Sequence, residues 1–110
     1  MKELSHLDLS ENDIGDVGIK EIINSCREYG TLEYLDISGN NIGKSSYCTE
    51  TADAINDFLV NNRTLETIKM NWNNIRGNMG EKIIEGLLLC YSIKEVHMNN
   101  NLLGVAYDDK

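Results

Sequence analysis

A pattern of apolar positions recurs four times along this chain of 110 residues. In the second copy the apolar residues Leu32, Leu35 and Ile37 are followed by Asn40 and Ile42. Two of the apolar positions lie two residues apart, which is the side-chain period of a strand, so the pattern predicts four short strands. The other copies fill the same positions in the same order: Leu4, Leu7, Leu9, Asn12 and Ile14; Leu65, Ile68, Met70, Asn73 and Ile75; and Ile93, Val96, Met98, Asn101 and Leu103.

The segments between these copies have the apolar spacing of a helix with one buried face. We therefore expect three helices, and Asp16 is the expected N-cap of the first. The copies begin near residues 4, 32, 65 and 93, so the second unit is longer than the others. We expect its extra residues, within 43–50, to form a lengthened loop between strand and helix. The expected buried faces are Ile19, Ile22, Ile23 and Cys26; Ala52, Ile55, Phe58 and Leu59; and Ile83, Ile84, Leu87 and Leu88.

Alternating strands and helices at a regular period predict a solenoid. The units resemble leucine-rich repeats of the ribonuclease-inhibitor class, and the turn NDIGDVG over residues 12–18 is similar to that class's signature. The resemblance implies an α/β horseshoe over residues 1–110, with four parallel strands on the concave face and three helices on the convex face. Such repeats occur in intracellular nucleotide-binding innate receptors, Ran GTPase-activating protein, tropomodulins and axonemal regulatory subunits. Neither end resembles a capping repeat, so we expect a longer solenoid.

One asparagine follows each predicted strand, at Asn12, Asn40, Asn73 and Asn101. An amide side chain can both donate to and accept from the backbone of adjacent turns. We expect these four residues to form an internal structural ladder and to take no part in chemistry.

The strand residues between the apolar positions are expected to point outward in columns. Neighbouring strands lie about 4.8 Å apart, so these columns would form one continuous polar surface. From the strands to the rim where the chain leaves them, the columns are His6, Tyr34, Thr67 and Glu95; Asp8, Asp36, Lys69 and His97; Ser10, Ser38, Asn71 and Asn99; and Glu11, Gly39, Trp72 and Asn100.

Trp72 is the first candidate for partner binding, because it is the only tryptophan and exposed tryptophans are enriched among interface hot spots. The alternative is that it packs on an adjacent loop of its own chain. Residues 43–50 are open to the same two interpretations, a binding loop or a neutral insertion. The remaining candidates are Tyr34, Asp8, Asp36, Lys69, His97 and Asn71.

Catalysis is not expected. Asp8 and Asp36 are neighbours in one column, but Lys69 beside them indicates charge pairing between strands. His6 and His97 lie on the first and last strands, too far apart to share a site. The sequence predicts no enzyme, no cofactor and no metal site.

The net charge of −8 argues against nucleic acid and anionic lipid as partners, because both attract basic surfaces. It is compatible with a basic protein partner, or it serves solubility alone. Three cysteines without a CxxC pair fit a reducing, cytoplasmic location. The sequence also lacks an apolar run that could span a membrane.

We therefore predict a protein-binding scaffold that uses its concave face. The alternative is a GTPase-activating protein, with Arg76 after the third strand, or a cytoskeletal regulator. The uncapped ends also allow end-to-end association of copies.

Overall fold

Strands and helices alternate along the chain in the predicted order. The computed structural model describes residues 4–27 and 30–102, so the last predicted position, Leu103, and the tail after it lie outside the described residues. No helix in these two ranges is long and apolar enough to cross a membrane. The elements are β1 (His6–Asp8), α1 (Gly15–Cys26), β2 (Tyr34–Asp36), α2 (Cys48–Asn61), β3 (Thr67–Lys69), α3 (Gly77–Leu89) and β4 (Glu95–His97).

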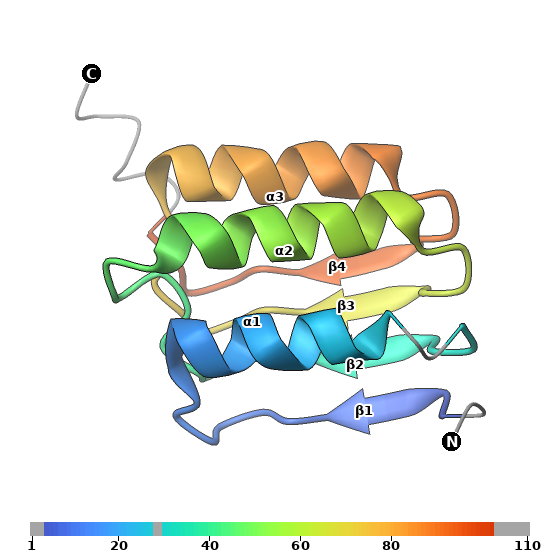
Figure 1. Ribbon diagram of the computed structural model, residues 1–110, viewed down its shortest axis with the longest axis horizontal. Helices are drawn as coiled ribbons and strands as arrows, with labels where there is room; N and C mark the ends of the chain where they lie inside the picture. Colours follow the sequence, from blue (N-terminus) through green and yellow to red (C-terminus); the bar gives the residue numbers. More distant parts are fainter. Residues whose placement is uncertain (1–3, 28–29, 103–110) are drawn as a thin grey trace.

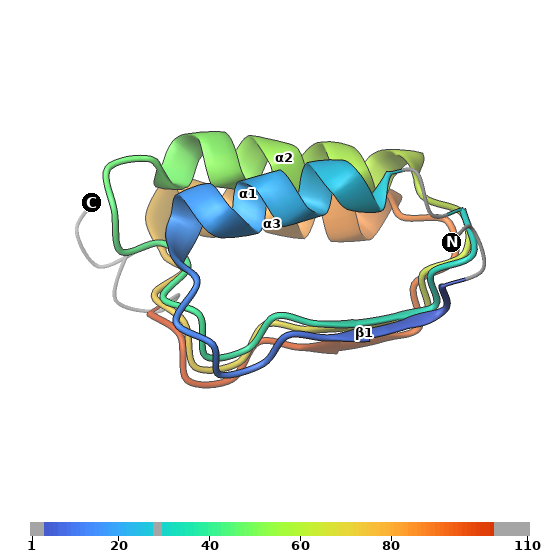
Figure 2. The same ribbon diagram turned by 60° about the horizontal axis from the view of Figure 1, so that its bottom comes forward.

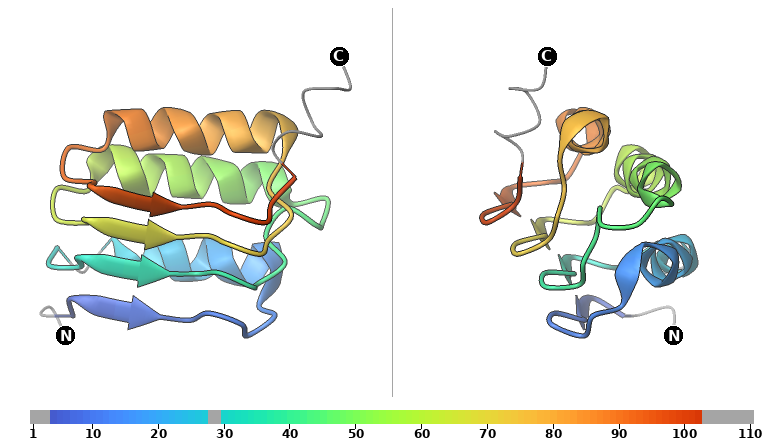
Figure 3. Two further views of the ribbon diagram at one scale, coloured as in Figure 1. Left: turned by 180° about the vertical axis from the view of Figure 1, so that it is seen from behind. Right: turned by 90° about the vertical axis from the view of Figure 1, so that its left-hand side faces the viewer.

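The four strands form one parallel sheet in the order β1-β2-β3-β4, with the helices in a second layer on one side (Figures 1 and 2). Seen end-on, each strand and its helix form one coil stacked on the next (Figure 3). The register pairs Tyr34 with His6 on one side and with Thr67 on the other, as the columns predicted. The structure therefore confirms the α/β leucine-rich-repeat solenoid with four parallel strands and three helices.

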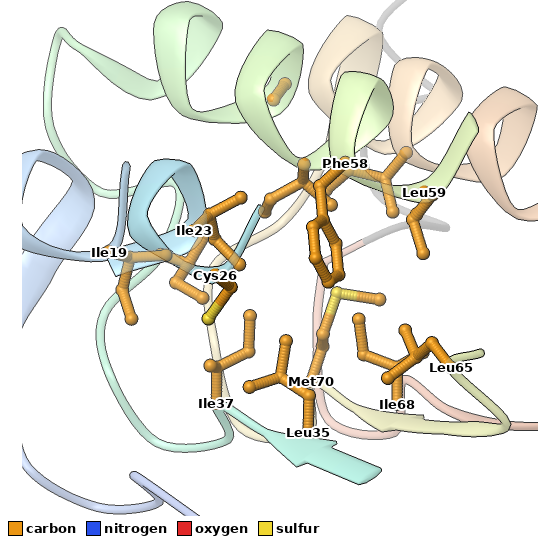
Figure 4. Packing of buried hydrophobic residues seen from close by; sticks show 14 of the residues in the cluster. Ile19, Ile23, Cys26, Leu35, Ile37, Phe58, Leu59, Leu65, Ile68 and Met70 are labelled. Carbon is orange, nitrogen blue, oxygen red and sulfur yellow. The ribbon is translucent and has the colours of Figure 1, made fainter. Parts of the chain in front are cut away.

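The core lies between the two layers (Figure 4). Phe58 of α2 points from the helix layer toward Met70, which follows β3, and both side chains are buried. Leu35 of β2 and Ile68 of β3 are fully buried from the sheet side. Burial of one such side chain stabilises the fold by roughly 1.5–3 kcal/mol. The middle repeats therefore supply most of the packing that holds the sheet to the helices.

The predicted buried face is wrong at two positions of α3. Ile84 and Leu88 were expected in the core, yet their side chains are 36% and 80% exposed. Ile23 of α1 is fully buried, because α2 packs against α1. In the described part of the chain no helix follows α3 to cover Ile84 and Leu88 in the same way.

The loop of the long second unit ends earlier than predicted, and the first helix begins with a different N-cap. The loop covers residues 43–47, because α2 already begins at Cys48. Asp16 is not the N-cap of α1; Ile14 occupies that position, and Asp16 lies buried in the first turn. Its carboxylate accepts the backbone N–H groups of Gly43 and Ser45, at 2.8 and 2.9 Å. An acidic side chain of the first repeat therefore fixes the loop of the second.

Candidate functional site

The four template asparagines form hydrogen bonds between successive repeats. The Asn40 side-chain oxygen accepts the backbone N–H groups of Asn12 and Ile14, at 3.2 and 3.1 Å. Asn73 and Asn101 make the same kind of bond to the repeat before each of them. Each of these three amides also donates to a backbone carbonyl of the preceding repeat, so it bonds that repeat both as acceptor and as donor. The side chains of Asn40, Asn73 and Asn101 are therefore occupied by backbone groups, whereas Asn12 is exposed and donates only within its own turn.

The face of the sheet that points away from the helices, here called the strand face, carries an aromatic stack. The rings of His6 and Tyr34 lie parallel, with centroids 4.1 Å apart. The Lys69 ammonium lies 5.3 Å from the centroid of the Tyr34 ring. The pKa of Lys69 is raised, chiefly by a hydrogen bond with the Tyr34 side chain and further by the charges of Asp36 and Glu95. Tyr34 thus holds a cation on the strand face, an attraction typical of aromatic rings.

The neighbouring carboxylates Asp8 and Asp36 are each used locally. Asp8 accepts the backbone N–H of Ser10 at 3.0 Å and its hydroxyl at 2.7 Å, and these bonds lower the pKa of Asp8. Asp36 accepts the backbone N–H of Ser38 at 3.0 Å. Contrary to the prediction of an outward, accessible column, Asp36 and Ser38 are each only 9% exposed, because strands flank them on both sides. These bonds to Ser10 and Ser38 hold each carboxylate in place on the sheet.

The last strand carries a second polar pair. His97 Nε2 lies 2.8 Å from Glu95 Oε2, and this hydrogen bond is the main reason that the pKa of Glu95 is lowered. His6 stands on the opposite edge strand, so the two histidines do not meet. Asn71 uses its side-chain oxygen to accept the backbone N–H of Asn99 at 2.7 Å. The described residues hold no group of three or more metal-ligating side chains.

Trp72 lies on the rim where the chain leaves β3, and its backbone adopts a left-handed conformation with φ of +56°. Glu11, Gly39 and Asn100, at the same template position, have positive φ angles as well. Glycine adopts this conformation without strain, whereas a bulky side chain there is an outlier that costs roughly 1–2 kcal/mol. The Trp72 side chain remains 67% exposed, so little burial compensates for the strain. Trp72 is therefore an exposed aromatic side chain on a strained backbone position of the rim.

The structure brings the sequence candidates together in two places. Tyr34, Lys69, Asp8 and His97 share the strand face with the less accessible Asp36, whereas Trp72 and Asn71 lie at the strand exits. His6 is not among the residues predicted from the sequence, although its position beside Tyr34 in the first column was a sufficient signal for the stack.

Comparison with known proteins agrees with this architecture. The profile of the family described as Leucine Rich repeat matches residues 3–22, 31–45 and 61–83. Comparison with curated protein sequences finds no match. A solved structure titled "Leiomodin-1 Actin-Binding Site 2 (ABS2)" aligns with a TM-score of 0.74 and 16% identity over 88% of this chain. The chain covers 54% of that structure's length, and at this identity the likeness concerns the fold alone.

Proposed function

We propose, starting from the fact that the chain belongs to the leucine-rich-repeat family, that it is a scaffold that binds a protein partner on its strand face and strand-exit rim. One observation carries the proposal: outward side chains of four strands lie in register and take no part in the core. The family, the strand face without a catalytic set and the neighbour's title all point to a non-catalytic binding protein. The helices of 12 to 14 residues support placing the repeats in the ribonuclease-inhibitor class.

The charge of the strand face supports a basic segment of the partner. Asp8, Asp36 and Glu95 contribute three carboxylates there, against the single ammonium of Lys69. The net charge of −8 favours such a protein segment over nucleic acid or an anionic membrane. Cys26, Cys48 and Cys90 are free, which supports a reducing, cytoplasmic location.

Actin is the first partner to test, because the solved structure that shares the fold is an actin-binding site. The measurement is isothermal titration calorimetry with monomeric actin. Tyr34→Ala should weaken binding by about 2 kcal/mol, since it removes an aromatic contact and the stacking partner of His6 and Lys69. Glu85→Ala, on the exposed side of α3, is the matched control and should leave the affinity unchanged. Binding that survives Tyr34→Ala would refute the use of the strand face, and no binding would refute actin as the partner.

End-to-end association of copies is a separate part of the proposal. Ile84 and Leu88 of α3 and Val96 of β4 are exposed at the carboxyl-terminal end of the described stack. Apolar surface of this kind is often covered by another protein chain. Sedimentation velocity at rising concentration measures it directly. A mass that stays at 12.4 kDa would refute association.

A further inference from the structure

The segments that connect strand to helix in the second and third repeats contain no carboxylate. These segments, residues 37–47 and 70–76, are here called the exit edge. Acidic residues make up 18 of the 110 in the chain, so segments of this length would ordinarily hold several. The charged residues of the exit edge are Lys44 and Arg76. The equivalent segment of the first repeat, residues 9–14, is acidic instead, with Glu11 and Asp13.

The two segments of the exit edge lie against each other. The Asn74 backbone N–H donates to the Ile42 carbonyl at 2.7 Å, and the Asn73 side chain accepts the N–H of Ile42 at 2.9 Å. Gly43 has a φ of +98°, and a β-carbon there would clash with the Asn74 carbonyl. The two segments therefore form one continuous edge, to which Lys44 and Arg76 belong by sequence, and Figure 3 shows these connecting loops stacked where the chain leaves the strands.

Both cations lack the partners that five other cations among the described residues have. Lys44 and Arg76 are exposed, and neither forms an ion pair or a ring contact within the described residues. An exposed cation without a local partner can pair with a ligand without first breaking another ion pair. The partnered cations are Arg27, Lys82 and Lys94, which pair with carboxylates, and Arg63 and Lys69, which lie over tyrosine rings.

The exit edge also presents two exposed aromatic side chains, Trp72 and Tyr47, at 67% and 55% exposure. Trp72 stands in its left-handed conformation at the end of β3, and Tyr47 lies in the loop of the second repeat. The hydrogen bonds from Gly43 and Ser45 to the buried Asp16 hold that loop in place. The surface is therefore preformed, and a preformed surface loses less entropy when it binds.

We propose that the exit edge docks an acidic peptide segment of the partner, with Trp72 and Tyr47 as contact residues and Lys44 and Arg76 as its charge complement. The inference rests on the proposed protein-binding function and adds the chemistry of a second contact beside the strand face. Aromatic residues and arginine are the side chains enriched in interface cores. Two cations are too few for a nucleic-acid footprint in a chain of net charge −8, so an acidic peptide fits better.

The chain contains its own reporter for this test, because Trp72 is its only tryptophan. The probes are three short tryptophan-free peptides of equal length that alternate Glu, Gln or Lys with Ala and Leu. The Glu peptide should shift Trp72 emission, and its affinity should fall as salt rises, because salt screens exposed charges. No response to the Glu peptide, or an equal response to the Gln peptide, would overturn the proposal.

Charge reversal tests the two cations, with calorimetry as a readout that does not depend on Trp72. The double variant Lys44→Glu and Arg76→Glu should weaken Glu-peptide binding by at least ~10-fold. Lys20→Glu is the matched control, since Lys20 on α1 also has no ion pair among the described residues but lies off the exit edge. Circular dichroism establishes that both variants fold. An equal loss in the control would overturn the proposal, as would tighter binding of the Lys peptide or of a single-stranded oligonucleotide to the exit edge.

The peptide experiments distinguish failure of the exit-edge proposal from failure of the strand-face proposal. If Glu-peptide binding survives Tyr34→Ala but is lost in the double variant, the exit edge stands whatever becomes of the strand face. If the Lys peptide binds through Tyr34 and the Glu peptide does not bind, the strand face stands and the exit edge is refuted.

Discussion

Asn40 and Asn12 occupy the same template position in adjacent repeats, yet their surroundings differ. Asn40 is fully buried, accepts two backbone N–H groups from the first repeat and donates to three carbonyl groups. Asn12 is exposed and donates only to the carbonyl groups of Leu9 and Ser10 in its own turn. The template supplies the same side chain to both repeats, and the repeats on either side decide how much it stabilises.

The largest expected effect is on the middle of the ladder. Asn40→Ala should lower the free energy of unfolding by about 3 kcal/mol, because it leaves several buried backbone groups without partners. Asn12→Ala, the matched variant at the first rung, should cost less than about 1 kcal/mol, since water can replace its bonds. Urea denaturation followed by circular dichroism measures both. Equal losses would show that the template position, and not its neighbours, sets the energy.

Asp16 sharpens the comparison, because it belongs to the first repeat but is buried by the loop of the second. Asp16→Ala should cost about 2 kcal/mol, since two charge-assisted hydrogen bonds to backbone N–H groups are lost. Asp13→Ala is the control: Asp13 bonds Asn41 in an exposed position and should contribute little. The same urea denaturation measures both variants. A loss no greater than that of Asp13→Ala would show that Asp16 does not hold the loop of the second repeat.

The middle repeats are expected to gain most from their side chains, and Trp72 is an exception. It lies in a middle repeat, but its exposed side chain gains little from burial. Trp72→Gly should raise the free energy of unfolding by about 0.5–1 kcal/mol, since glycine adopts the left-handed conformation without strain. Trp72→Ala keeps the strain and is the control. Thermal unfolding compares the two variants. A glycine variant no more stable than the alanine variant would show that Trp72 is not strained.

The smallest expected effect on stability comes from Glu95 on the last strand. The folded-state pKa of Glu95 is lowered mainly by His97, so its contribution to stability is present at higher pH and is lost as the pH falls through that folded-state pKa. His97→Ala should raise the pKa of Glu95 toward its ordinary value and reduce this acid sensitivity. An NMR titration of the carboxyl group measures the pKa directly. The pKa of Asp8, which Ser10 lowers, should not move; an unmoved Glu95 would contradict the pairing.

The strands and their register were predictable because constant offsets in parallel strands place equivalent residues side by side, as with His6 and Tyr34. Asp16 was not, because its partners, Gly43 and Ser45, lie 27 and 29 residues away and depend on the path of a lengthened loop. The burial of Ile84 was predicted wrongly. Apolar residues at helical spacing indicate which face of a helix favours burial, but they do not show whether another helix packs on that face.

The template positions of the candidate binding residues could be predicted from the sequence. Their exposure and their contacts were harder to predict. The strain at Trp72 had a signal in the sequence, since Gly39 occupies the same template position. The low exposure of Asp36 had none, because it arises from flanking strands rather than from the residue itself. The exit edge has cations and no carboxylates, and the sequence contains this information. It becomes visible only when the fold places Lys44 and Arg76, which are 32 residues apart, on one edge.

The direction of the asparagine ladder bears on how the chain is made. Each amide oxygen accepts N–H groups from the repeat before it, as Asn73 does from Asn40. Synthesis runs from the amino end, so every repeat leaves the ribosome before the asparagine that completes its hydrogen bonding. A newly made repeat therefore has backbone N–H groups without their partner until the next repeat is made. The smallest unit that can complete this hydrogen bonding during translation is a pair of repeats.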